Sequence, residues 1–565
     1  MGAFDYRRRK SREVNIGGVK LGGENPLRVQ SMTNTSTMDT EGSVAQSRRI
    51  AAAGADYVRL TAQGVREAEN LGEIRRILRE SGENVPLIAD IHFNPRAAWA
   101  SAERVEKVRI NPGNFVDPGR VFKQLEYTDE QYAAELERIR EALVPFYEFC
   151  REHGTVVRIG VNHGSLSDRI MSRYGDTPAG MVESAMEFLR VAKSIGFNDI
   201  VISMKASNTV VMVESVRRLV KAMEAEGMDY PLHLGVTEAG DGEDGRVKSA
   251  VGIGTLLAEG IGDTLRVSLS EAPEAEVPVA IALRDYITAR ATAPSVKGEM
   301  ADGYDPVTPT RRETKECGII GGKQPQVVVG TDASAEYEPD SRPDIFGTDG
   351  MLTLDASMPR EDLIKAVGEA AGCAVVLKSS AANPVAELQA VIHDMSRHGL
   401  KNPVIARLNY DGLGADDVTL RAAADFGTLL LNGAIDGIMI EADGMTPTRL
   451  AHLAFGILQA ARCRITRTEF ISCPGCGRTL FDLQSTVKTI KEATSHLKGL
   501  KLGIMGCIVN GPGEMADADY GYVGAAAGHV SLYRGKECVA KNIPADEALD
   551  RLIELLKADG KWTEK

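Results

Sequence analysis

Long apolar segments are absent from this chain of 565 residues, and no run approaches the roughly 18 to 20 residues that a membrane span requires. The basic start, residues 1–18, lacks the apolar core of a secretory signal, so we expect a cytoplasmic protein with no membrane segment. Basic charge is also in deficit, since 66 Lys and Arg against 79 Asp and Glu give a net charge of −13. This balance argues against nucleic-acid binding but allows a local cationic pocket.

Cysteine is scarce as well. The eight cysteines are too few for a disulfide scaffold, and a chain of this length buries enough core to fold without one. In a cytosolic protein, clustered cysteines indicate metal binding instead. No G-x-G-x-x-G fingerprint follows the first predicted strands, so a dinucleotide-binding open sheet is not indicated.

The first 290 residues alternate between strand and helix patterns. Eight short β-branched runs recur at spacings of about 20 to 50 residues, with amphipathic segments between most of them. This alternation predicts a parallel sheet, and eight strands predict a closed (β/α)8 barrel over residues 1–290 rather than an open doubly wound sheet. The predicted strands are 26–33, 55–62, 85–93, 105–114, 155–165, 198–207, 230–240 and 263–270.

The sequence changes character after residue 290. A Pro- and Gly-rich stretch over 291–314 is typical of a linker or long loop, and five strand patterns with helical segments follow it. We expect residues 291–460 to form an α/β insert, for which a barrel-like arrangement is one option. Residues 461–565 contain a helix, a hairpin pattern and a closing amphipathic helix, which predict a small α+β domain.

Cations stand inside the predicted barrel strands, where both faces are buried and apolar side chains are expected. A buried cation without a partner is costly. A structural ion pair or a frayed strand end would explain one such residue, but five near the carboxyl ends of their strands favour a binding site. They are Arg59, Arg109, Arg158, Lys205 and Arg266.

Polar residues of the same strands point to the same side as these cations, because alternate residues of a strand share a face. The pairs are Arg109 with Asn111, Arg158 with Asn162, Ser203 with Lys205, and Arg266 with Ser268. Arginine forks around phosphate oxygens and lysine adds a compact charge. Together they predict a strongly anionic ligand, most simply a diphosphate, at the carboxyl-terminal end of the barrel.

Two carboxylates stand among these cations. Asp90 ends the third predicted strand and Glu238 ends the seventh. A carboxylate in such a place either pairs with an arginine or handles a substrate hydroxyl or proton. We expect Asp90 to orient the substrate and Glu238 to transfer a proton or bind a hydroxyl, whereas His233 is expected to be a core residue.

The cysteines of the last section are grouped. Cys473 and Cys476 form a C-x2-C pair, and Cys507 follows within "GIMGCIVNGPGE". Three thiolates suit either zinc or an iron–sulfur cluster, and no fourth Cys or His stands close to Cys507. Glu514 lies seven residues after Cys507 across a Gly-Pro-Gly turn and can supply a weaker, displaceable oxygen ligand.

Taken in order, these motifs resemble the 4-hydroxy-3-methylbut-2-enyl diphosphate synthase family, iron–sulfur enzymes late in the methylerythritol phosphate route to isoprenoids. The similarity covers residues 26–280 and 461–530, and the block at 291–460 resembles the insert of the longer, three-domain form. The similar stretches are "VQSMTNT", "YVRLT", "ADIHF", "VRINPGN", "RIGVNHGSL", "SMKAS", "GVTEAG", "LRVSLS", "FISCPGCGRTLFDL" and "GCIVNGPGE".

The resemblance implies an oxidoreductase that opens the ring of 2-C-methyl-D-erythritol 2,4-cyclodiphosphate with two electrons and loss of water. A [4Fe-4S] cluster would supply the electrons, and ferredoxin or flavodoxin would recharge it. The implied cluster ligands are Cys473, Cys476, Cys507 and Glu514. The implied substrate-binding residues are Arg59, Arg109, Asn111, Arg158, Asn162, Lys205, Arg266 and Ser268, and the implied catalytic residues are Glu238, Glu514 and Asp90.

Two rival hypotheses remain open. The first is a zinc-containing barrel lyase or aldolase that acts on a phosphorylated substrate, and the second is a non-catalytic iron–sulfur redox sensor. The insert lacks a second set of strand-end cations, so we expect its role to be structural. Whether the site closes within one chain or across a homodimer is left undecided by the sequence.

Overall fold

The computed structural model describes residues 2–117, 126–508, 513, 515 and 517–564. Its contacts divide the chain into two compact units. The larger unit contains Arg9–Gly245, Gly262–Ile281 and Thr468–Lys565. The smaller unit contains Met1–Arg8, Arg246–Ile261 and Ala282–Arg467.

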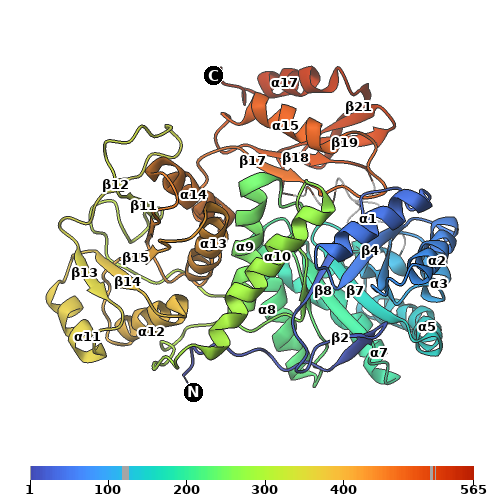
Figure 1. Ribbon diagram of the computed structural model, residues 1–565, viewed down its shortest axis with the longest axis horizontal. Coiled ribbons are helices and arrows are strands. Elements are labelled where there is room, and N and C mark those ends of the chain that lie inside the picture. The colour runs from blue at the N-terminus through green and yellow to red at the C-terminus, as the bar shows by residue number, and fades with distance from the viewer. Residues whose placement is uncertain (1, 118–125, 509–512, 514, 516, 565) are drawn as a thin grey trace. The chain divides into compact units, whose positions relative to one another are not determined.

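Eight parallel strands form one sheet in the order β8-β7-β6-β5-β4-β3-β10-β9. Of these, β4, β7 and β8 are labelled in Figure 1. A parallel bridge between Ile202 of β8 and Leu232, just before β9, joins the two ends of the sheet. The predicted (β/α)8 barrel is therefore confirmed. Its strands are β3 (Arg28–Met32), β4 (Tyr57–Ala62), β5 (Leu87–Ile91), β6 (Lys107–Ile110), β7 (Val156–Asn162), β8 (Ile200–Lys205), β9 (His233–Leu234) and β10 (Thr264–Leu265).

Several connecting helices begin at side chains that accept hydrogen bonds from their first turns, which fixes the short loops before them. Asn208 caps the helix that follows β8, and Thr128 forms a complete capping box with Gln131. The helices are α1 (Thr40–Ala52), α2 (Val65–Glu80), α3 (Pro95–Ala102), α4 (Pro112–Phe115), α5 (Asp129–His153), α6 (Asp168–Tyr174), α7 (Pro178–Ser194), α8 (Thr209–Ala225), α9 (Gly242–Ala258), α10 (Pro273–Thr288) and the 3-10 turn η1 (Ala289–Thr292).

An N-terminal hairpin, which the sequence did not predict, covers the amino-terminal end of the barrel. It consists of β1 (Val14–Ile16) and β2 (Val19–Leu21). Its apolar residues form a buried cluster with Tyr57, Ile88, Val156 and Val201, which stand at or near the starts of four barrel strands. With this end covered, the opposite, carboxyl-terminal end is the one left for a ligand.

The insert forms a six-stranded parallel sheet in the order β12-β11-β16-β15-β14-β13, which is half a barrel. Close packing of α9 against α13 depends on small residues, since a Cβ on Gly427 would lie 2.9 Å from the Cα of Val251. The strands are β11 (Val327–Gly330), β12 (Ile345–Phe346), β13 (Leu352–Asp355), β14 (Val375–Ser379), β15 (Val404–Asn409) and β16 (Gly437–Glu441). The helices are α11 (Arg360–Glu369), α12 (Pro384–Arg397), α13 (Ala415–Leu431) and α14 (Pro447–Ala460).

The C-terminal section is the predicted α+β fold. Its sheet runs β17-β18-β19-β20-β21, parallel over the first three strands and antiparallel over the rest. Two helices pack on one face of the sheet through a buried apolar cluster (Figure 1). The elements are β17 (Glu469–Ser472), α15 (Leu483–Thr494), β18 (Lys501–Met505), β19 (Tyr520–Ala526), β20 (His529–Arg534), β21 (Glu537–Pro544) and α17 (Ala548–Ala558).

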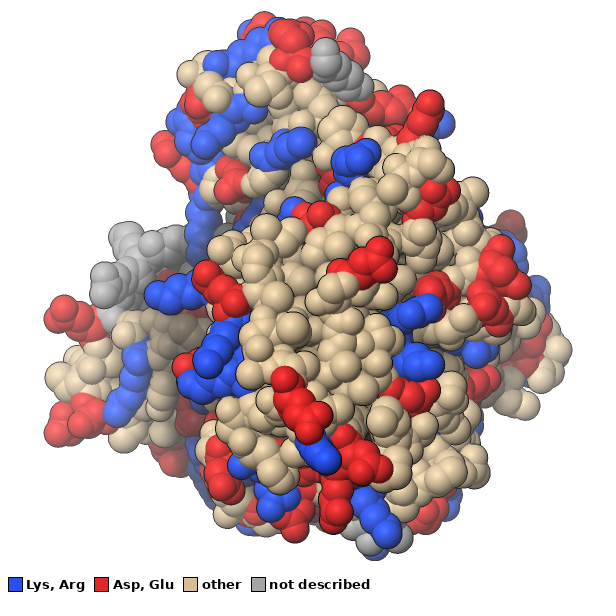
Figure 2. All heavy atoms as spheres, turned by 90° about the vertical axis from the view of Figure 1, so that its left-hand side faces the viewer, with Lys and Arg blue, Asp and Glu red and all other residues tan. Residues whose placement is uncertain are grey.

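The surface agrees with the charge balance of the sequence. On the face drawn in Figure 2, Lys and Arg are interspersed with Asp and Glu. Among the described helices, none is both long enough and apolar enough to cross a membrane.

Candidate functional site

A pocket in the larger unit collects the strand-end cations of the barrel. Arg59, Arg109, Arg158, Lys205 and Arg266 all line it, and each is at least nine-tenths buried. They come from five strands or strand ends of one parallel barrel, whose carboxyl ends meet at the same place. The same pocket is lined by Asp90, His92, Asn162, Glu238 and Ser268.

Arg109 is held in a fixed position by the neighbouring strands. Its Nη1 donates to Nε2 of His92 at 2.7 Å, and its Nη2 donates to the carbonyl of Gly160 at 3.0 Å. A Cβ on Gly160 would lie 2.4 Å from Nε of Arg109, so only glycine leaves room for this guanidinium. Gly235 does the same for Lys205, whose Nζ would lie 2.8 Å from an added Cβ. These two glycines permit long cations inside the barrel.

Two arginines of the pocket lack good acceptors. Nε and Nη2 of Arg59 donate to the sulfur of Met32 at 3.1 and 2.8 Å, and a thioether is a weak acceptor. Nε and Nη1 of Arg158 are buried without a hydrogen-bond partner among the described residues, and Nη2 lies 3.9 Å from Asp90. Buried guanidinium groups normally have their donors satisfied, so both side chains are arranged for a missing anionic acceptor.

Burial and mutual repulsion act on all of these charges. Burial lowers the pKa of Arg59 to about 10 and lowers the pKa values of Arg158 and Lys205 well below their usual values, and neighbouring cations add to each effect. Burial alone would raise the pKa of Asp90, but Arg59 and Arg109 hold it well below its usual value. An anionic ligand would reduce the repulsion that these cations now experience.

His92 is a neutral member of the pocket. Burial, with Arg478 and Arg109, lowers the pKa of His92 to about 3. Because a guanidinium can only donate, Nε2 of His92 accepts from Arg109. The ring therefore positions Arg109 without adding charge.

The acidic residues in and near the pocket have different environments. Asp90 lies 3.4 Å from Nη1 of Arg109 and 3.3 Å from Nε2 of His92. Glu238 is 4% exposed and has a φ of 48°, which is unusual for a residue other than glycine. Such strain is found at functional sites when the surrounding structure holds it in place. Glu276, below the pocket, pairs with Arg266 through two contacts of 2.9 Å.

The cysteines reach the same pocket from the C-terminal sheet. Cys473 follows β17 directly, and Cys507 follows β18 by two residues. Because β17 and β18 are parallel neighbours, both cysteines leave the same edge of the sheet. Cys473, Cys476 and Cys507 all line the pocket, and the amide of Gly506 donates to the sulfur of Cys473 at 3.3 Å. The barrel cations and the three thiols therefore face one cavity.

The three cysteines share one cavity. Within the described part of the chain, no three His, Cys, Asp or Glu side chains converge to hold one metal ion. A four-iron cluster binds each thiolate at a different iron and does not need such convergence. Glu514 lies outside the described residues. Three thiols around a common cavity are a donor set that suits an iron–sulfur cluster.

Direct contacts join the cysteine loop to the barrel. The hydroxyl of Ser270 lies 2.8 Å from that of Ser472 and donates to the carbonyl of Cys473 at 2.9 Å. Ala239 forms a parallel bridge with Ser472. On the other side of the pocket Gly164 packs closely on Gly513, since a Cβ on Gly164 would lie 1.9 Å from the Gly513 carbonyl oxygen.

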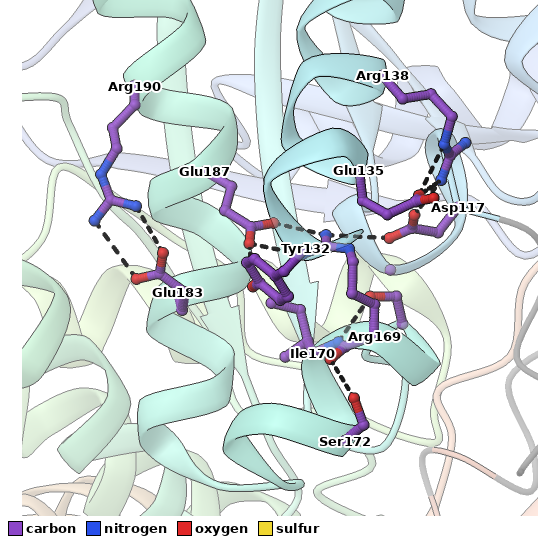
Figure 3. Close-up of polar contacts among 12 residues, drawn as sticks. Asp117, Tyr132, Glu135, Arg138, Arg169, Ile170, Ser172, Glu183, Glu187 and Arg190 are labelled. Atoms are coloured by element: carbon purple, nitrogen blue, oxygen red, sulfur yellow. Dashed lines mark hydrogen bonds and ion pairs between the residues drawn. The ribbon is translucent and has the colours of Figure 1, made fainter. Parts of the chain in front are cut away.

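A buried network supports the loop that contains Gly164. Arg169, in the helix after this loop, donates to both carboxylate oxygens of Glu187 at 2.7 Å, and the hydroxyl of Tyr132 donates to the same carboxylate at 2.5 Å (Figure 3). Arg169 also contacts Asp117, which accepts from Arg138 at 2.7 Å. The network ties α5, α6 and α7 together behind the pocket.

Most of the residues selected from the sequence lie in this pocket. The exceptions among the described residues are Ser203 and Asn111, and the buried Asn111 caps α4 by accepting from the amide of Gly113 at 3.1 Å. Sequence reasoning missed several pocket residues, among them Arg478, Met32 and Thr237. It also missed Lys107, which is fully buried, with its Nζ 4.7 Å from the centre of the Tyr57 ring. Lys107 lies two residues before Arg109, and this spacing could have identified it from the sequence as a second cation on the same face of the strand.

Comparisons with known proteins agree with this geometry. Residues 11–281 match the family model described as the GcpE TIM-barrel domain, and residues 469–558 match the GcpE protein C-terminal domain. A protein of Bacteroides fragilis is 54% identical over 617 residues, covering 100% of this chain and 98% of its own length. Relatives from Porphyromonas gingivalis, at 51%, and Akkermansia muciniphila, at 46%, are also similar over at least 98% of both chains. All three are named 4-hydroxy-3-methylbut-2-en-1-yl diphosphate synthase (flavodoxin).

Proposed function

The chain belongs to the 4-hydroxy-3-methylbut-2-en-1-yl diphosphate synthase family, and we propose that the pocket described above performs the reductive ring opening of 2-C-methyl-D-erythritol 2,4-cyclodiphosphate. The product is (E)-4-hydroxy-3-methylbut-2-enyl diphosphate, and water is released. The protein is thus an oxidoreductase of isoprenoid biosynthesis. The observation that carries the proposal is a single cavity lined by five strand-end cations and three cysteines.

The cations bind the diphosphate. Arg158 and Arg59 have donors without a strong acceptor, and Arg109 is held between His92 and Gly160. Phosphate oxygens satisfy such donors in charge-assisted pairs, which are about twice as strong as neutral hydrogen bonds. Lys205 and Arg266 add charge from the adjacent strands. We infer that bound substrate replaces the weak contacts of the free pocket.

The cysteines hold the redox group. Cys473, Cys476 and Cys507 would bind a [4Fe-4S] cluster, with Glu514 as the fourth ligand. When bound, the cluster supplies two electrons one at a time, which no amino-acid side chain can supply. Ser270 keeps the cysteine loop at the barrel end through its contacts with Ser472 and Cys473.

The two described carboxylates have different tasks. Asp90 stays ionised because Arg59 and Arg109 hold its pKa down, so it can only accept hydrogen bonds. It therefore orients the arginines and a substrate hydroxyl. Glu238 stands at the pocket wall with a strained backbone. We assign to it the proton with which the substrate hydroxyl leaves as water.

The electron donor that we propose is flavodoxin, because the curated relatives carry it in their names. Reduced donor and free thiols both require a reducing compartment, so we place the reaction in the cytoplasm. The cavity is lined by barrel and C-terminal residues of one chain, which supports closure of the site without a second subunit. We propose a structural role for the insert, residues 291–460, between the barrel of 1–290 and the cluster domain of 461–565.

Iron and substrate binding test this function together. Protein purified without oxygen should contain about four irons and four inorganic sulfides per chain. The cyclic diphosphate should bind to this protein and bind much more weakly to Arg109→Ala, with the iron content unchanged. A colourless protein that contains zinc would favour the barrel lyase instead. Cluster-containing protein that binds no cyclic diphosphate would favour the redox sensor.

A further inference from the structure

Exposed apolar side chains are concentrated around the cysteines. Of the eight large hydrophobic residues that are strongly exposed among the described residues, five, including Val210, lie on loops or first helical turns that follow strands with pocket-lining residues. Met38, Val65 and Phe93 are 44, 38 and 50% exposed, and Ile508, directly after Cys507, is 51% exposed. Single exposed apolar residues are normal, but a group beside a functional site indicates an interaction surface. We call Met38, Val65 and Phe93 the apolar rim.

The apolar rim lies on three consecutive strand-to-helix connections that are tied to one another, and its Val65 is the first residue of α2. Its residues follow β3, β4 and β5 at the carboxyl end of the barrel. The side-chain amide of Asn70 donates to the carbonyl of Thr37 at 2.6 Å, which joins the first loop to α2. The side-chain amide of Asn94 donates to the carbonyl of Gln63 at 3.4 Å, which joins the third loop to the second. The rim is therefore a continuous part of the surface.

The same loops touch the cysteine loop. A Cβ on Gly477 would lie 2.7 Å from the carbonyl of Thr35 and 2.7 Å from the hydroxyl of Thr61. Gly477 follows Cys476 directly, so the first loop of the rim and the end of β4 pack against the C-x2-C segment. A partner on the apolar rim would thus lie close to the thiols. Electron transfer falls off steeply with distance, so such closeness is what an electron donor needs.

Phe93 is the most exposed member of the rim and the most strained. Its φ of 59° places a bulky aromatic residue in the left-handed region, which strains the backbone. Its ring is centred 6.4 Å from the ring of His92, which lines the pocket. Burial of the Phe93 ring does not offset this strain, because half of the residue is exposed. A binding partner would cover this ring.

Two cations flank Phe93 and Val65. Arg66 and Arg96 are both exposed, and within the described structure neither forms an ion pair or hydrogen bond through its side chain. Asp39, on the first loop, is engaged as the cap of α1. The chain as a whole carries a charge of −13 and repels acidic proteins. Two unpaired arginines beside an apolar group therefore select for a partner with carboxylates around an apolar centre.

We propose that the apolar rim, with Arg66 and Arg96, is the docking surface for the electron donor, a small acidic electron-transfer protein. This inference rests on the proposed function, and flavodoxin is the donor used to test it. In each encounter the reduced donor would pass one electron to the cluster that Cys473, Cys476 and Cys507 would hold, and two encounters would supply one turnover. No covalent bond forms. A small, partly apolar and partly charged contact is typical of transient redox complexes, which bury less than about 1,200 Å².

Assays with two different electron sources distinguish an effect on docking from an effect on catalysis. Turnover of the cyclic diphosphate is measured with reduced flavodoxin and, separately, with dithionite and a viologen mediator that needs no docking surface. The variants are Phe93→Ser and the double charge reversal Arg66→Glu, Arg96→Glu. The matched control is Ile319→Ser, which removes an apolar residue that is 52% exposed in the smaller unit.

We expect the KM for flavodoxin to rise at least about tenfold in both variants, which corresponds to about 1.4 kcal/mol. Turnover with dithionite should stay within about twofold of wild type, and the control should match wild type with both reductants. Raising the salt concentration should raise the KM of the wild type for flavodoxin towards that of the charge-reversal variant, because salt screens the attraction between the charges. Loss of activity with both reductants in both variants would overturn the docking role, as would wild-type kinetics with flavodoxin.

Failure of the proposed function would look different. A wild-type protein that gives no product with dithionite contradicts the reaction itself rather than the docking surface. In that case binding of oxidised flavodoxin, followed by its flavin fluorescence, still compares wild type with the two variants. Equal dissociation constants for all three proteins would overturn the docking surface without reference to turnover.

Discussion

A Cβ atom on Gly160 would lie 2.4 Å from Nε of Arg109, inside the volume that the guanidinium occupies. We expect Gly160→Ala to displace Arg109 from His92 and from the substrate. The KM for the cyclic diphosphate should rise at least about tenfold, because one charge-assisted pair contributes about 1.5–3 kcal/mol. The control is Gly414→Ala, where an added Cβ meets nothing within 4 Å. Unchanged KM in Gly160→Ala would show that Arg109 does not bind substrate.

The contact between Ser270 and the cysteine loop gives a second prediction. Removing the hydroxyl in Ser270→Ala leaves the carbonyl of Cys473 without this donor and loosens the loop. A hydrogen bond contributes about 1 kcal/mol, so we expect kcat to fall about fivefold. KM and iron content should stay unchanged, because no cation or thiol is altered. Equal kcat in Ser270→Ala and wild type would mean that the loop is held by other contacts.

The buried network behind the pocket should dominate the stability of this region. Glu187→Ala leaves Arg169 and Tyr132 without their shared carboxylate and should lower the free energy of unfolding by about 3–5 kcal/mol. The control is Glu183→Ala, drawn in the same view (Figure 3), which breaks a half-exposed pair with Arg190 and should cost about 0–1 kcal/mol. Urea unfolding followed by the fluorescence of Trp99 and Trp562 reports on the larger unit, which contains both. Equal losses in the two variants would contradict a supporting role for the network.

His92 gives a prediction about pH. Its pKa is lowered to about 3, so the ring stays neutral from pH 5.5 to 8, where an ordinary histidine would titrate near 6.5. The unfolded chain takes up this proton below pH 6.5 and the folded chain does not, so His92 lowers stability as the pH falls from 6.5 towards 3. In substrate binding, the ratio of Kd values between His92→Gln and wild type should stay constant from pH 5.5 to 8. A ratio that changes about tenfold around pH 6.5 would mean that His92 becomes charged.

The sequence predicted the barrel and its cations because both depend on local patterns. Strand spacing predicted the eight strands, and charges such as Arg158 and Lys205 stood out against apolar neighbours. The N-terminal hairpin was missed because β1 and β2 have only three residues each. Asn111 was grouped with Arg109 by its spacing, but β6 ends at Ile110 and Asn111 begins a helix turn instead.

Contacts between segments that lie far apart in the chain could not be predicted from the sequence. Arg478 lines the pocket only because the C-terminal sheet brings its loop to the barrel. Gly160 and Gly235 carry no chemistry of their own, and their importance is visible only beside Arg109 and Lys205. The same holds for the apolar rim, whose members come from three separate loops.

The most direct test of the central claim is turnover of 2-C-methyl-D-erythritol 2,4-cyclodiphosphate by the anaerobically purified protein with dithionite as the electron source, with the product identified by mass spectrometry. The account predicts (E)-4-hydroxy-3-methylbut-2-enyl diphosphate, with one product molecule for every two electrons consumed. Glu514→Ala should give far less product than wild type. A fully loaded iron–sulfur protein that leaves the cyclic diphosphate unchanged would contradict the account.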